Sequence, residues 1–316
     1  MSNETAKILI GTSGYSYPGP PPRGWGGVFY PKGRKRVGDL EYYSQFFDTV
    51  EINTTFYRPP DAAVTQAWVK RTPASFEFAV KVWQKFTHAR KVGEEVGGEQ
   101  EKWEEPAQAD VDLFRNQIEP LAQSGKLGVL LFQYPPAFHY TKGNVQRLQW
   151  TLRSFKDYPK VVELRHRSWS DRAEETRAFL LELGAGWALI DEPKFASSVR
   201  QDFEPLGDIL YFRAHGRNAA SWWSPPEAWM RYDYCYSRGE VHELANELKR
   251  IVTQKTHLAR AFVFFNNHAR GQAVVNAIMF SYEMGLPIRA HPLHALVEAF
   301  PQLSSIVSAP AQQTLF

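Results

Sequence analysis

The sequence of 316 residues predicts an α/β protein, a single domain with the (β/α)8 architecture of a TIM barrel. Three observations support this prediction. Strand-like runs alternate with amphipathic helical segments along the whole chain, which is the pattern of parallel βαβ units. Eight such units can be counted, as a closed barrel requires. Several of the strand-like runs carry a polar face, which the interior of a barrel can accommodate.

The expected strands are short runs that are either apolar throughout or alternate between apolar and polar residues. They cover residues 7–13, 49–57, 76–82, 128–134, 160–166, 186–191, 208–215 and 261–265. Alternation over such a run predicts a strand, because successive side chains point to opposite faces. The clearest case is 49–57, in which Glu51, Asn53 and Thr55 form the polar face.

Between these runs, apolar residues recur at helical spacing. The expected helices cover residues 39–47, 60–71, 108–123, 145–155, 171–183, 240–252, 273–284 and 292–299. The sixth unit is the weakest, because residues 192–206 show no helical pattern. Long irregular loops follow strands 1, 3 and 7. An open doubly wound sheet is the alternative, although the chain lacks the Gly-x-Gly-x-x-Gly turn after its first strand.

The composition is that of a globular protein. Hydrophobic residues make up 43% of the chain and charged residues 22%, and the net charge of +3 calls for no polyanionic partner. A single cysteine, Cys235, excludes an internal disulfide and favours a cytoplasmic location. We expect no signal peptide and no membrane span. Residues 1–302 are assigned to the barrel domain and residues 303–316 to a flexible C-terminal tail.

Placing the apolar strand faces against the helices leaves a polar set in the interior. This set comprises Glu51, Asn53, Glu77, Lys81, Gln133, Glu163, Arg165, Asp191, Arg213, His215 and Asn267. Most of these residues lie near the C-terminal ends of their strands, where barrel enzymes carry their active sites. A structural ion-pair network is the alternative, and Glu77, early in its strand, fits that role. Because buried ion pairs are costly to assemble, we favour a functional site for the rest.

The residue types in this set indicate acid/base chemistry on an anionic substrate. Neighbouring carboxylates and cations shift each other's pKa values, as proton transfer requires. The candidate catalytic residues are Glu51, Lys81, Glu163, Asp191 and His215. Guanidinium groups bind carboxylate or phosphate bidentately, and barrels often bind phosphate beside their last strands. The candidate substrate-binding residues are Ser13, Asn53, Thr55, Gln133, Arg165, Arg213, Arg217, Asn266 and Asn267, although the asparagine pair also suits a helix cap.

The sequence does not favour a metal or a nucleotide cofactor. Glu51, Glu163, Asp191 and His215 offer oxygen and nitrogen donors for a divalent metal, but their spacing matches no diagnostic motif. No motif indicates a nucleotide cofactor. Glu51 and Glu163 would also suit a retaining glycosidase, but the fourth and seventh strands lack the glutamate pair that many barrel glycosidases place there.

The C-terminus carries a separate signal. The last residues, QQTLF at 312–316, resemble the short peptide with which bacterial DNA polymerases and repair proteins bind the DNA sliding clamp. Gln312, Leu315 and Phe316 are the candidate partner-binding residues, because a groove can take a glutamine and two adjacent apolar anchors. A frayed tail without a partner is the alternative.

Several motifs follow, in order, the pattern of a known family. They are GTSGY at 11–15, FYP at 29–31, VEINTTFY at 50–57, FAVK at 78–81, TH at 87–88, ELR at 163–165, YFRAHGR at 211–217, YDY at 232–234 and FFNNH at 264–268. The chain resembles the YecE-like family, also called domain of unknown function 72, over nearly its whole length. The resemblance implies a TIM-barrel fold and a bacterial or archaeal cytoplasmic protein, but no established activity. The chain departs from the family pattern at Tyr15, where Trp is usual, and by an insertion at 18–22.

Three functions fit these observations. The first is an enzyme, tethered to the sliding clamp, that hydrolyses a phosphorylated or nucleic-acid-related substrate at a polar anion-binding site. The second is a carbohydrate-active or isomerase-type barrel, whose aromatic loops would stack on sugars. The third is a non-catalytic adaptor that binds a ligand and the clamp.

Overall fold

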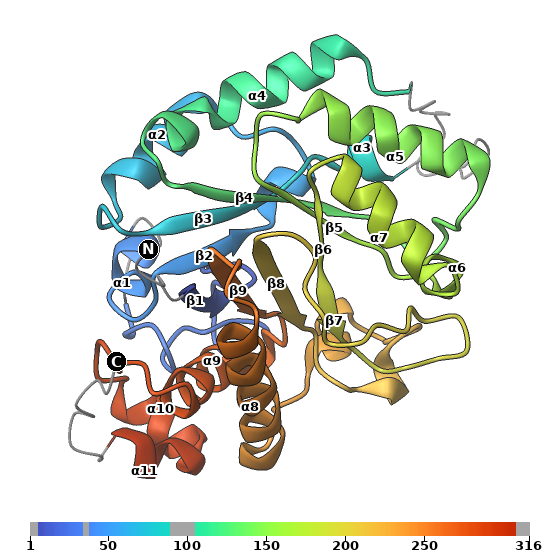
Figure 1. Ribbon diagram of the computed structural model, residues 1–316. Helices are drawn as coiled ribbons and strands as arrows, with labels where there is room; N and C mark the ends of the chain where they lie inside the picture. Colours follow the sequence, from blue (N-terminus) through green and yellow to red (C-terminus); the bar gives the residue numbers. More distant parts are fainter. Residues whose placement is uncertain (1–5, 34–37, 89–104, 308–316) are drawn as a thin grey trace.

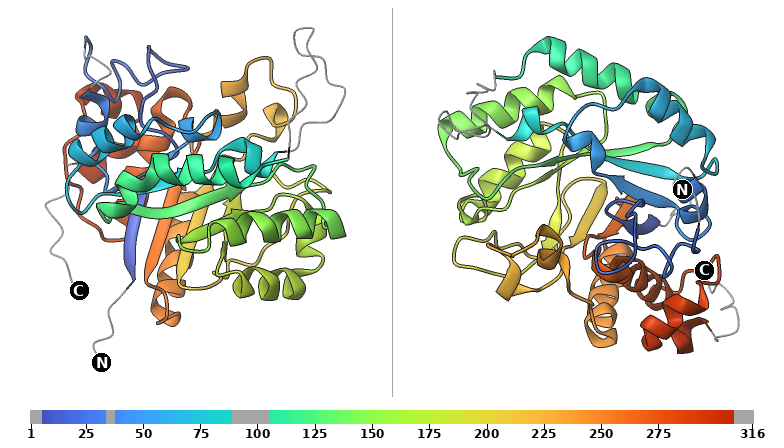
Figure 2. Two further views of the ribbon diagram at one scale, coloured as in Figure 1. Left: turned by 90° about the horizontal axis from the view of Figure 1, so that it is seen from above. Right: turned by 180° about the vertical axis from the view of Figure 1, so that it is seen from behind.

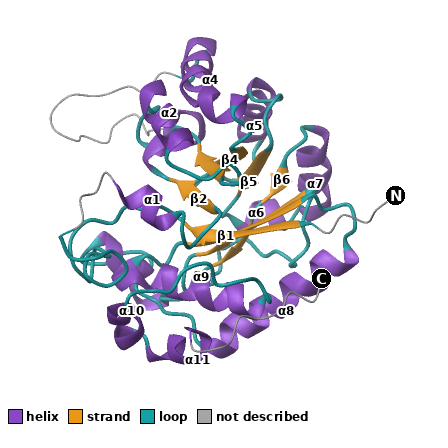
Figure 3. Cartoon of the chain, turned by 90° about the vertical axis from the view of Figure 1, so that its left-hand side faces the viewer, coloured by secondary structure: helices purple, strands orange, loops and turns teal. Residues whose placement is uncertain are grey.

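In the computed structural model, which describes residues 6–33, 38–88 and 105–307, the strands lie at the centre and the helices around them (Figures 1 and 3). The strands are β1 (Lys7–Thr12), β2 (Thr49–Ile52), β3 (Glu77–Lys81), β4 (Leu127–Gln133), β5 (Lys160–Glu163), β6 (Gly186–Trp187), β7 (Leu189–Asp191), β8 (Ile209–Ala214) and β9 (Arg260–Phe265). The α-helices are α1 (Asp39–Tyr43), α2 (Ala62–Lys70), α3 (Gln84–Thr87), α4 (Gln108–Gln123), α5 (Lys142–Ser154), α6 (Arg167–Ser170), α7 (Ala173–Glu182), α8 (Arg238–Gln254), α9 (Gln272–Glu283), α10 (His294–Ala299) and α11 (Ser304–Val307).

The strands form two parallel sheets. One has the order β1-β9-β8-β7 and the other the order β2-β3-β4-β5-β6. Helices α2, α4, α5 and α7 cover the second sheet, while α8, α9 and α10 lie on the side of the first (Figures 1 and 2). The predicted α/β fold with parallel strands is therefore confirmed. The hydrogen-bonded pairing of the strands is divided between two sheets, however, and does not form the single continuous sheet of the predicted barrel.

The two sheets approach each other at two places. Between β1 and β2, the Gly14 amide donates to the Glu51 carbonyl at 2.8 Å. A Cβ atom at Gly11 would lie 2.2 Å from the Thr49 carbonyl oxygen, so only glycine permits this approach. At the other place, the expected sixth strand is interrupted at Ala188, so that β6 pairs with β5 and β7 pairs with β8. One short stretch of chain thus contacts both sheets.

Apolar side chains pack on both faces of the strands. The larger cluster includes Phe78 and Val80 of β3 and lies between the strands and the helices. The residue between them, Ala79, belongs to a smaller cluster on the opposite, interior face. This smaller cluster contains Leu9, Ala79, Val129, Leu131, Val161, Ala188, Ile209, Tyr211, Phe262 and Phe264. The interior is therefore apolar along most of its length, and polar residues replace this packing toward the C-terminal ends of the strands.

Most of the expected elements are present, and α4 has the predicted bounds. The strand expected at 49–57 is shorter than predicted: β2 ends at Ile52, and a 3-10 helix follows at Thr54–Phe56. The Thr55 hydroxyl donates to the carbonyls of Ile52 (3.2 Å) and Lys81 (2.6 Å), which holds the chain in this turn. As expected, residues 192–206 contain no helix. None of the described helices has the length and apolar character of a membrane span.

Candidate functional site

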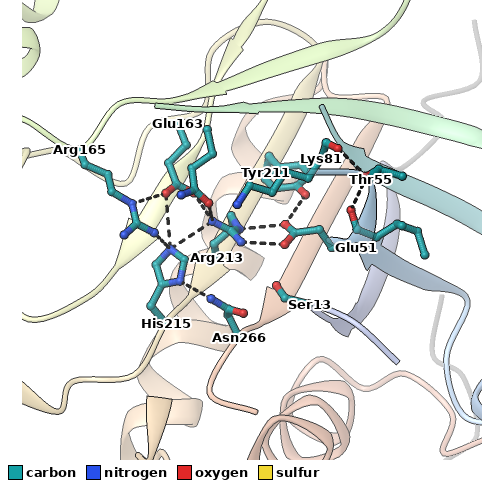
Figure 4. Close-up of polar contacts among 12 residues, drawn as sticks. Ser13, Glu51, Thr55, Lys81, Glu163, Arg165, Tyr211, Arg213, His215 and Asn266 are labelled. Atoms are coloured by element: carbon teal, nitrogen blue, oxygen red, sulfur yellow. Dashed lines mark hydrogen bonds and ion pairs between the residues drawn. The ribbon is translucent and has the colours of Figure 1, made fainter. Parts of the chain in front are cut away.

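A buried ionic network joins the C-terminal ends of β2, β5 and β8 (Figure 4). Arg213 donates to Glu51 with two nitrogens, Nε to Oε2 at 2.8 Å and Nη2 to Oε1 at 2.7 Å. Its Nη1 donates to Oε2 of Glu163 and, at 3.0 Å, to Oε1 of Gln133. The Tyr211 hydroxyl donates to Oε2 of Glu51 at 2.7 Å. The structure therefore brings together the carboxylates and the arginine that the strand alternation placed in the interior.

Arg165 and His215 extend this network. Nε of Arg165 donates to Oε1 of Glu163 at 2.5 Å, and Nη2 donates to Nε2 of His215 at 3.0 Å. Burial favours the neutral form of Glu163, but the charges of Arg165 and Arg213 outweigh it and hold the carboxyl pKa well below its usual range. Burial, together with the same two guanidinium groups, lowers the pKa of His215 to about 3. His215 is thus neutral at physiological pH and accepts a proton poorly.

The guanidinium groups that we expected to hold an anionic substrate are already paired. Arg213 contacts two carboxylates, and Arg165 contacts Glu163 and His215. Such pairing matches the structural ion-pair network that the sequence left as an alternative. Within this network, Glu51 and Glu163 neutralise Arg213, and Glu163 also neutralises Arg165.

Asp191 and Arg217 pair with each other, outside the network. Arg217 donates to Oδ2 of Asp191 from Nε at 2.9 Å and to Oδ1 from Nη2 at 3.0 Å. The Tyr236 hydroxyl donates to the same carboxylate at 2.6 Å, and Arg217 also contacts Glu240 in the first turn of α8. Asp191 and Arg217 therefore join β7 to α8 and do not line the cavity described below.

Asn267 also points away from the interior. Its Nδ2 atom donates to the Tyr234 carbonyl and to Oδ1 of Asn276 in α9, each at 2.7 Å. The interior positions of β9 are Phe262 and Phe264, so the alternation turns Asn266 inward and Asn267 outward. Asn267 therefore positions a loop against a helix, whereas Asn266 contacts His215 at 2.9 Å (Nδ2 to Nδ1).

A cavity of about 710 Å³ opens beside the network, at the C-terminal ends of the strands. Five of the predicted site residues line it: Asn53, Lys81, Gln133, Arg213 and Asn266. Among the predicted site residues that do not line the cavity, Thr55 is buried in its turn and Ser13 is fully buried. The hydroxyl of Ser13 has no hydrogen-bond partner in the described part of the chain.

Aromatic side chains that the sequence analysis did not assign to the site form much of the cavity wall. They are Tyr15, Tyr17, Phe56, Tyr57, Tyr232 and His268. They come from the segments that follow β1, β2, β8 and β9. Tyr57 is 71% exposed at the mouth of the cavity, and Tyr17 stacks on His268 with ring centroids 4.6 Å apart. The abundance of aromatic residues in these loops was the available signal.

Lys81 is the last residue of β3, and its ammonium group lies 3.8 Å from the centroid of the Phe56 ring. It forms no ion pair with a carboxylate among the described residues, in contrast to Arg213, Arg165 and Arg217. Burial, reinforced by the charge of Arg213, lowers the pKa of Lys81 to about 7, although Glu51 and Glu163 act in the opposite direction. At neutral pH this lysine is therefore divided between its ammonium and amine forms, as a proton-transfer group requires.

No group of three or more His, Cys, Asp and Glu side chains is arranged to hold a metal ion within the ranges that the structure describes. The candidate clamp-binding residues Gln312, Leu315 and Phe316 lie outside those ranges.

The fold and the site define a class of α/β protein with parallel strands and with polar and aromatic residues gathered at the strand C-termini. The family model described as "Protein of unknown function DUF72" matches residues 9–298, and the chain belongs to this family, which is the YecE-like family of the sequence analysis. A curated relative, the UPF0759 protein YunF of Bacillus subtilis (strain 168), is 31% identical over 265 residues, which cover 80% of this chain and 89% of the relative.

Solved structures show the same fold. A DUF72 family protein from Thermotoga maritima is 34% identical, with a TM-score of 0.73 over 87% of this chain and 98% of its own. A DUF72 family protein from Enterococcus faecalis V583 is 27% identical, with a TM-score of 0.73 over 88% of this chain and 96% of its own. The family assignment made from the sequence motifs is therefore confirmed.

Proposed function

We propose that the protein is an enzyme that acts on a small phosphorylated substrate in the 710 Å³ cavity, with Lys81 as its proton-transfer group. One observation carries this proposal. Lys81 reaches the cavity without a carboxylate partner among the described residues, while Arg213 and Arg165 in the adjacent network are paired. An unpaired cation in a cavity is more available to a substrate than a cation that a carboxylate already neutralises.

Hydrolysis is the reaction that this arrangement suits best. A water molecule attacks phosphorus, the bond from phosphorus to the leaving oxygen breaks, and the Lys81 ammonium gives its proton to that oxygen. One proton of the attacking water stays on a phosphate oxygen, and its release to solvent balances the proton that the Lys81 amine regains. A lysine whose pKa is near 7 carries this proton at neutral pH and can regain it from water. Glu51, Glu163 and Arg213 act as positioning residues, because their mutual charges fix the wall that faces Lys81.

A carbohydrate substrate is the second candidate, and a specific observation favours it. Oδ1 of Asn53 and Nδ1 of His268 are buried at the cavity without hydrogen-bond partners among the described residues. A sugar supplies hydroxyl donors to such atoms, and its ring stacks on aromatic side chains such as Tyr57. The chemistry of an isomerase would then use the amine form of Lys81 as the base.

The decisive experiment compares wild type with Lys81→Met and Lys81→Arg on a panel of phosphomonoesters, phosphodiesters and aryl glycosides. Lys81→Met should lower kcat by about 10²–10⁴-fold, the usual range for losing a proton-transfer group. Lys81→Arg should be equally inactive, because arginine keeps the charge but does not release its proton. Glu77→Gln, at the other end of β3, is the matched control and should retain activity. Full activity in Lys81→Met would contradict the proposal.

The architecture that we propose is a closed (β/α)8 barrel in which the two sheets meet beside Gly14 and at Ala188. The hydrogen bond from Gly14 to Glu51 and the shared contacts of β6 and β7 support this closure. We also propose a cytoplasmic location, supported by the use of one cysteine only.

The C-terminal motif supports a separate proposal, a tether to the bacterial DNA sliding clamp. It rests on the sequence of residues 312–316 alone. Deletion of these five residues should abolish capture of the purified clamp and leave turnover in the cavity unchanged. Clamp binding that survives both the deletion and a Leu315→Ala/Phe316→Ala pair would overturn it.

A further inference from the structure

A second, smaller pocket lies beside the main cavity at the same end of the strands. Its volume is about 110 Å³, and its lining includes Arg165, Glu192, Ser197, Trp222 and Arg231. These residues come from the segments after β5, β7 and β8. At about 30 Å³ for each water molecule, the pocket holds roughly three or four waters. It is therefore large enough for one compact polar group and too small for a ring system.

Glu192 provides a buried acceptor in this pocket. Glu192 is 5% exposed, and its Oε2 atom has no hydrogen-bond partner in the part of the chain that the structure describes. The nearest cation is Arg165, whose Nη1 atom lies 3.7 Å from that oxygen, beyond hydrogen-bond distance. Burial raises the pKa of Glu192 despite this neighbouring charge. A ligand that donates a hydrogen bond to this unpartnered oxygen would therefore be stabilised by it.

Arg231 provides a buried donor. Its Nε atom is buried and has no acceptor among the described residues. Its guanidinium group also forms no ion pair with a described carboxylate, unlike Arg165, Arg213 and Arg217. Guanidinium groups bind the oxygens of phosphate and carboxylate with several parallel hydrogen bonds. The pocket therefore combines one unpaired donor with one unpaired acceptor.

One buried side chain contacts a lining residue of each pocket. His215 is fully buried, and its Nε2 accepts from Arg165, which lines the small pocket. Its Nδ1 contacts Asn266, which lines the main cavity. A molecule that extends past His215 would place one end near Arg231 and the other end in the cavity that contains Lys81.

We infer that the small pocket binds a singly protonated phosphate group, whose oxygens accept from Arg231 and Arg165 and whose P–OH donates to Glu192. The group is either free phosphate or the phosphate of a monoester. Where it belongs to the substrate, it is a phosphate other than the one hydrolysed beside Lys81, and the assignment of the pocket as a second part of that site rests on the proposed function. The binding step itself is independent of catalysis.

The proton on the ligand makes this inference testable against sulfate. Sulfate has the tetrahedral shape of phosphate but carries no proton at neutral pH, so it would place an acceptor against the Glu192 carboxyl group. Titration calorimetry of the full-length protein at pH 6.5 should show phosphate and methyl phosphate binding at least tenfold more tightly than sulfate. Equal affinity for phosphate and methyl phosphate indicates that the pocket recognises monoesters, and binding of inorganic phosphate alone restricts the inference to the free ion.

Three variants locate the binding. Arg231→Met should weaken phosphate binding at least tenfold. Glu192→Gln should bring sulfate affinity within about threefold of phosphate, because the amide can donate to sulfate. Glu77→Gln, at the opposite end of β3, should leave inorganic phosphate affinity unchanged. Unchanged melting temperatures for Arg231→Met and Glu192→Gln will show that both variants are folded, and Arg231→Lys provides a second test if the methionine variant is unstable.

The inference would be overturned by an absence of phosphate binding at millimolar concentration, or by binding that Lys81→Met removes and Arg231→Met leaves intact. It would also be overturned if wild type did not distinguish phosphate from sulfate. The proposed function is tested by a separate result. If the protein binds phosphate at Arg231 but turns over no substrate in the panel, the phosphate site stands and the proposed enzymatic function is wrong.

Discussion

Strand β3 carries one charged residue at each end, and the two are in opposite states. Glu77 is its first residue and Lys81 its last, and a spacing of four places both on the interior face. Glu77 accepts from Lys7 at 2.7 Å, and Nη1 of Arg260 lies 3.3 Å from its other oxygen. Lys81 instead faces a cavity and forms no ion pair with a described carboxylate.

This difference shows how charges in one interior divide between structure and function. At the N-terminal ends of the strands, Glu77 is neutralised by two cations at the edge of the solvent. At the C-terminal ends, Arg213 is likewise neutralised, but Lys81 beside it is not. In barrels the C-terminal end is the end that carries the active site. An unpaired charge at this end is therefore better evidence for a site than the presence of many charges.

The largest effect should come from removing Arg213. Arg213→Met leaves the buried carboxylate of Glu51 without the guanidinium group that pairs with it, and leaves the buried carboxylate of Glu163 with Arg165 alone. We expect the free energy of unfolding to fall by about 3–5 kcal/mol, the usual cost of breaking a buried ion pair on one side. Urea denaturation monitored by circular dichroism measures this change.

The matched control for Arg213→Met is Arg231→Met, which removes a guanidinium group that has no carboxylate partner in the described structure. It should change the free energy of unfolding by less than about 1 kcal/mol. Equal losses in the two variants would show that the ionic network does not stabilise the fold through its pairing.

The second effect is a gain in stability on removing Lys81. Its folded-state pKa of about 7 lies below the ordinary value of 10.5, so the unfolded chain holds the proton more tightly. Between these two pH values the unfolded state binds more protons, and the stability of the wild type therefore rises with pH. Below pH 7 the full cost of burying the ammonium group applies. Lys81→Met, which keeps the apolar contact with Phe56, should stabilise the protein by about 1–2 kcal/mol at pH 6.

The advantage of Lys81→Met should shrink between pH 7 and pH 10, because the buried amine of the wild type is then neutral. Denaturation of both proteins at pH 6 and pH 9.5 measures the difference. Competitive acetylation of the wild type provides an independent value, with a midpoint near pH 7 for Lys81 and above pH 10 for exposed lysines. A midpoint for Lys81 at the exposed value would show that the cavity does not lower its pKa.

The convergence of Glu51, Glu163 and Arg213 was predictable from the sequence. Each lies on the polar face of an alternating strand, and the C-terminal ends of parallel strands meet at one edge. Their mutual pairing was not predictable, because Arg213 lies 50 or more residues away from both carboxylates in the sequence and reaches them only across the interior. A sequence shows that charges share an interior but not which of them neutralise each other.

The placement of residues around the cavity differs from the sequence-based expectation where strands end or break. Ala188 lies in the interior cluster and Glu192, four residues later, lines the small pocket, whereas Asp191 pairs with Arg217 outside the network. Neighbouring residues of a strand point to opposite faces of the sheet, so the prediction that placed Asp191 inward assigned Glu192 to the other face. The aromatic wall of the cavity comes from loops such as the one that carries Tyr232. The path of such a loop depends on tertiary packing and cannot be predicted from a periodic pattern of apolar residues.

The smallest effect should come from the other end of β3. Glu77→Gln removes the charge that Lys7 and Arg260 contact, but the side chain of Lys7 is 47% exposed and that of Arg260 is 38% exposed. Solvent screens such pairs, so we expect a loss of only about 0.5–1 kcal/mol, and less at 1 M salt. Denaturation at low and high salt measures both values. A loss as large as that of Arg213→Met would remove the distinction between the two ends of the strands, because Glu77 would then be as strongly coupled to the fold as the network beside Lys81.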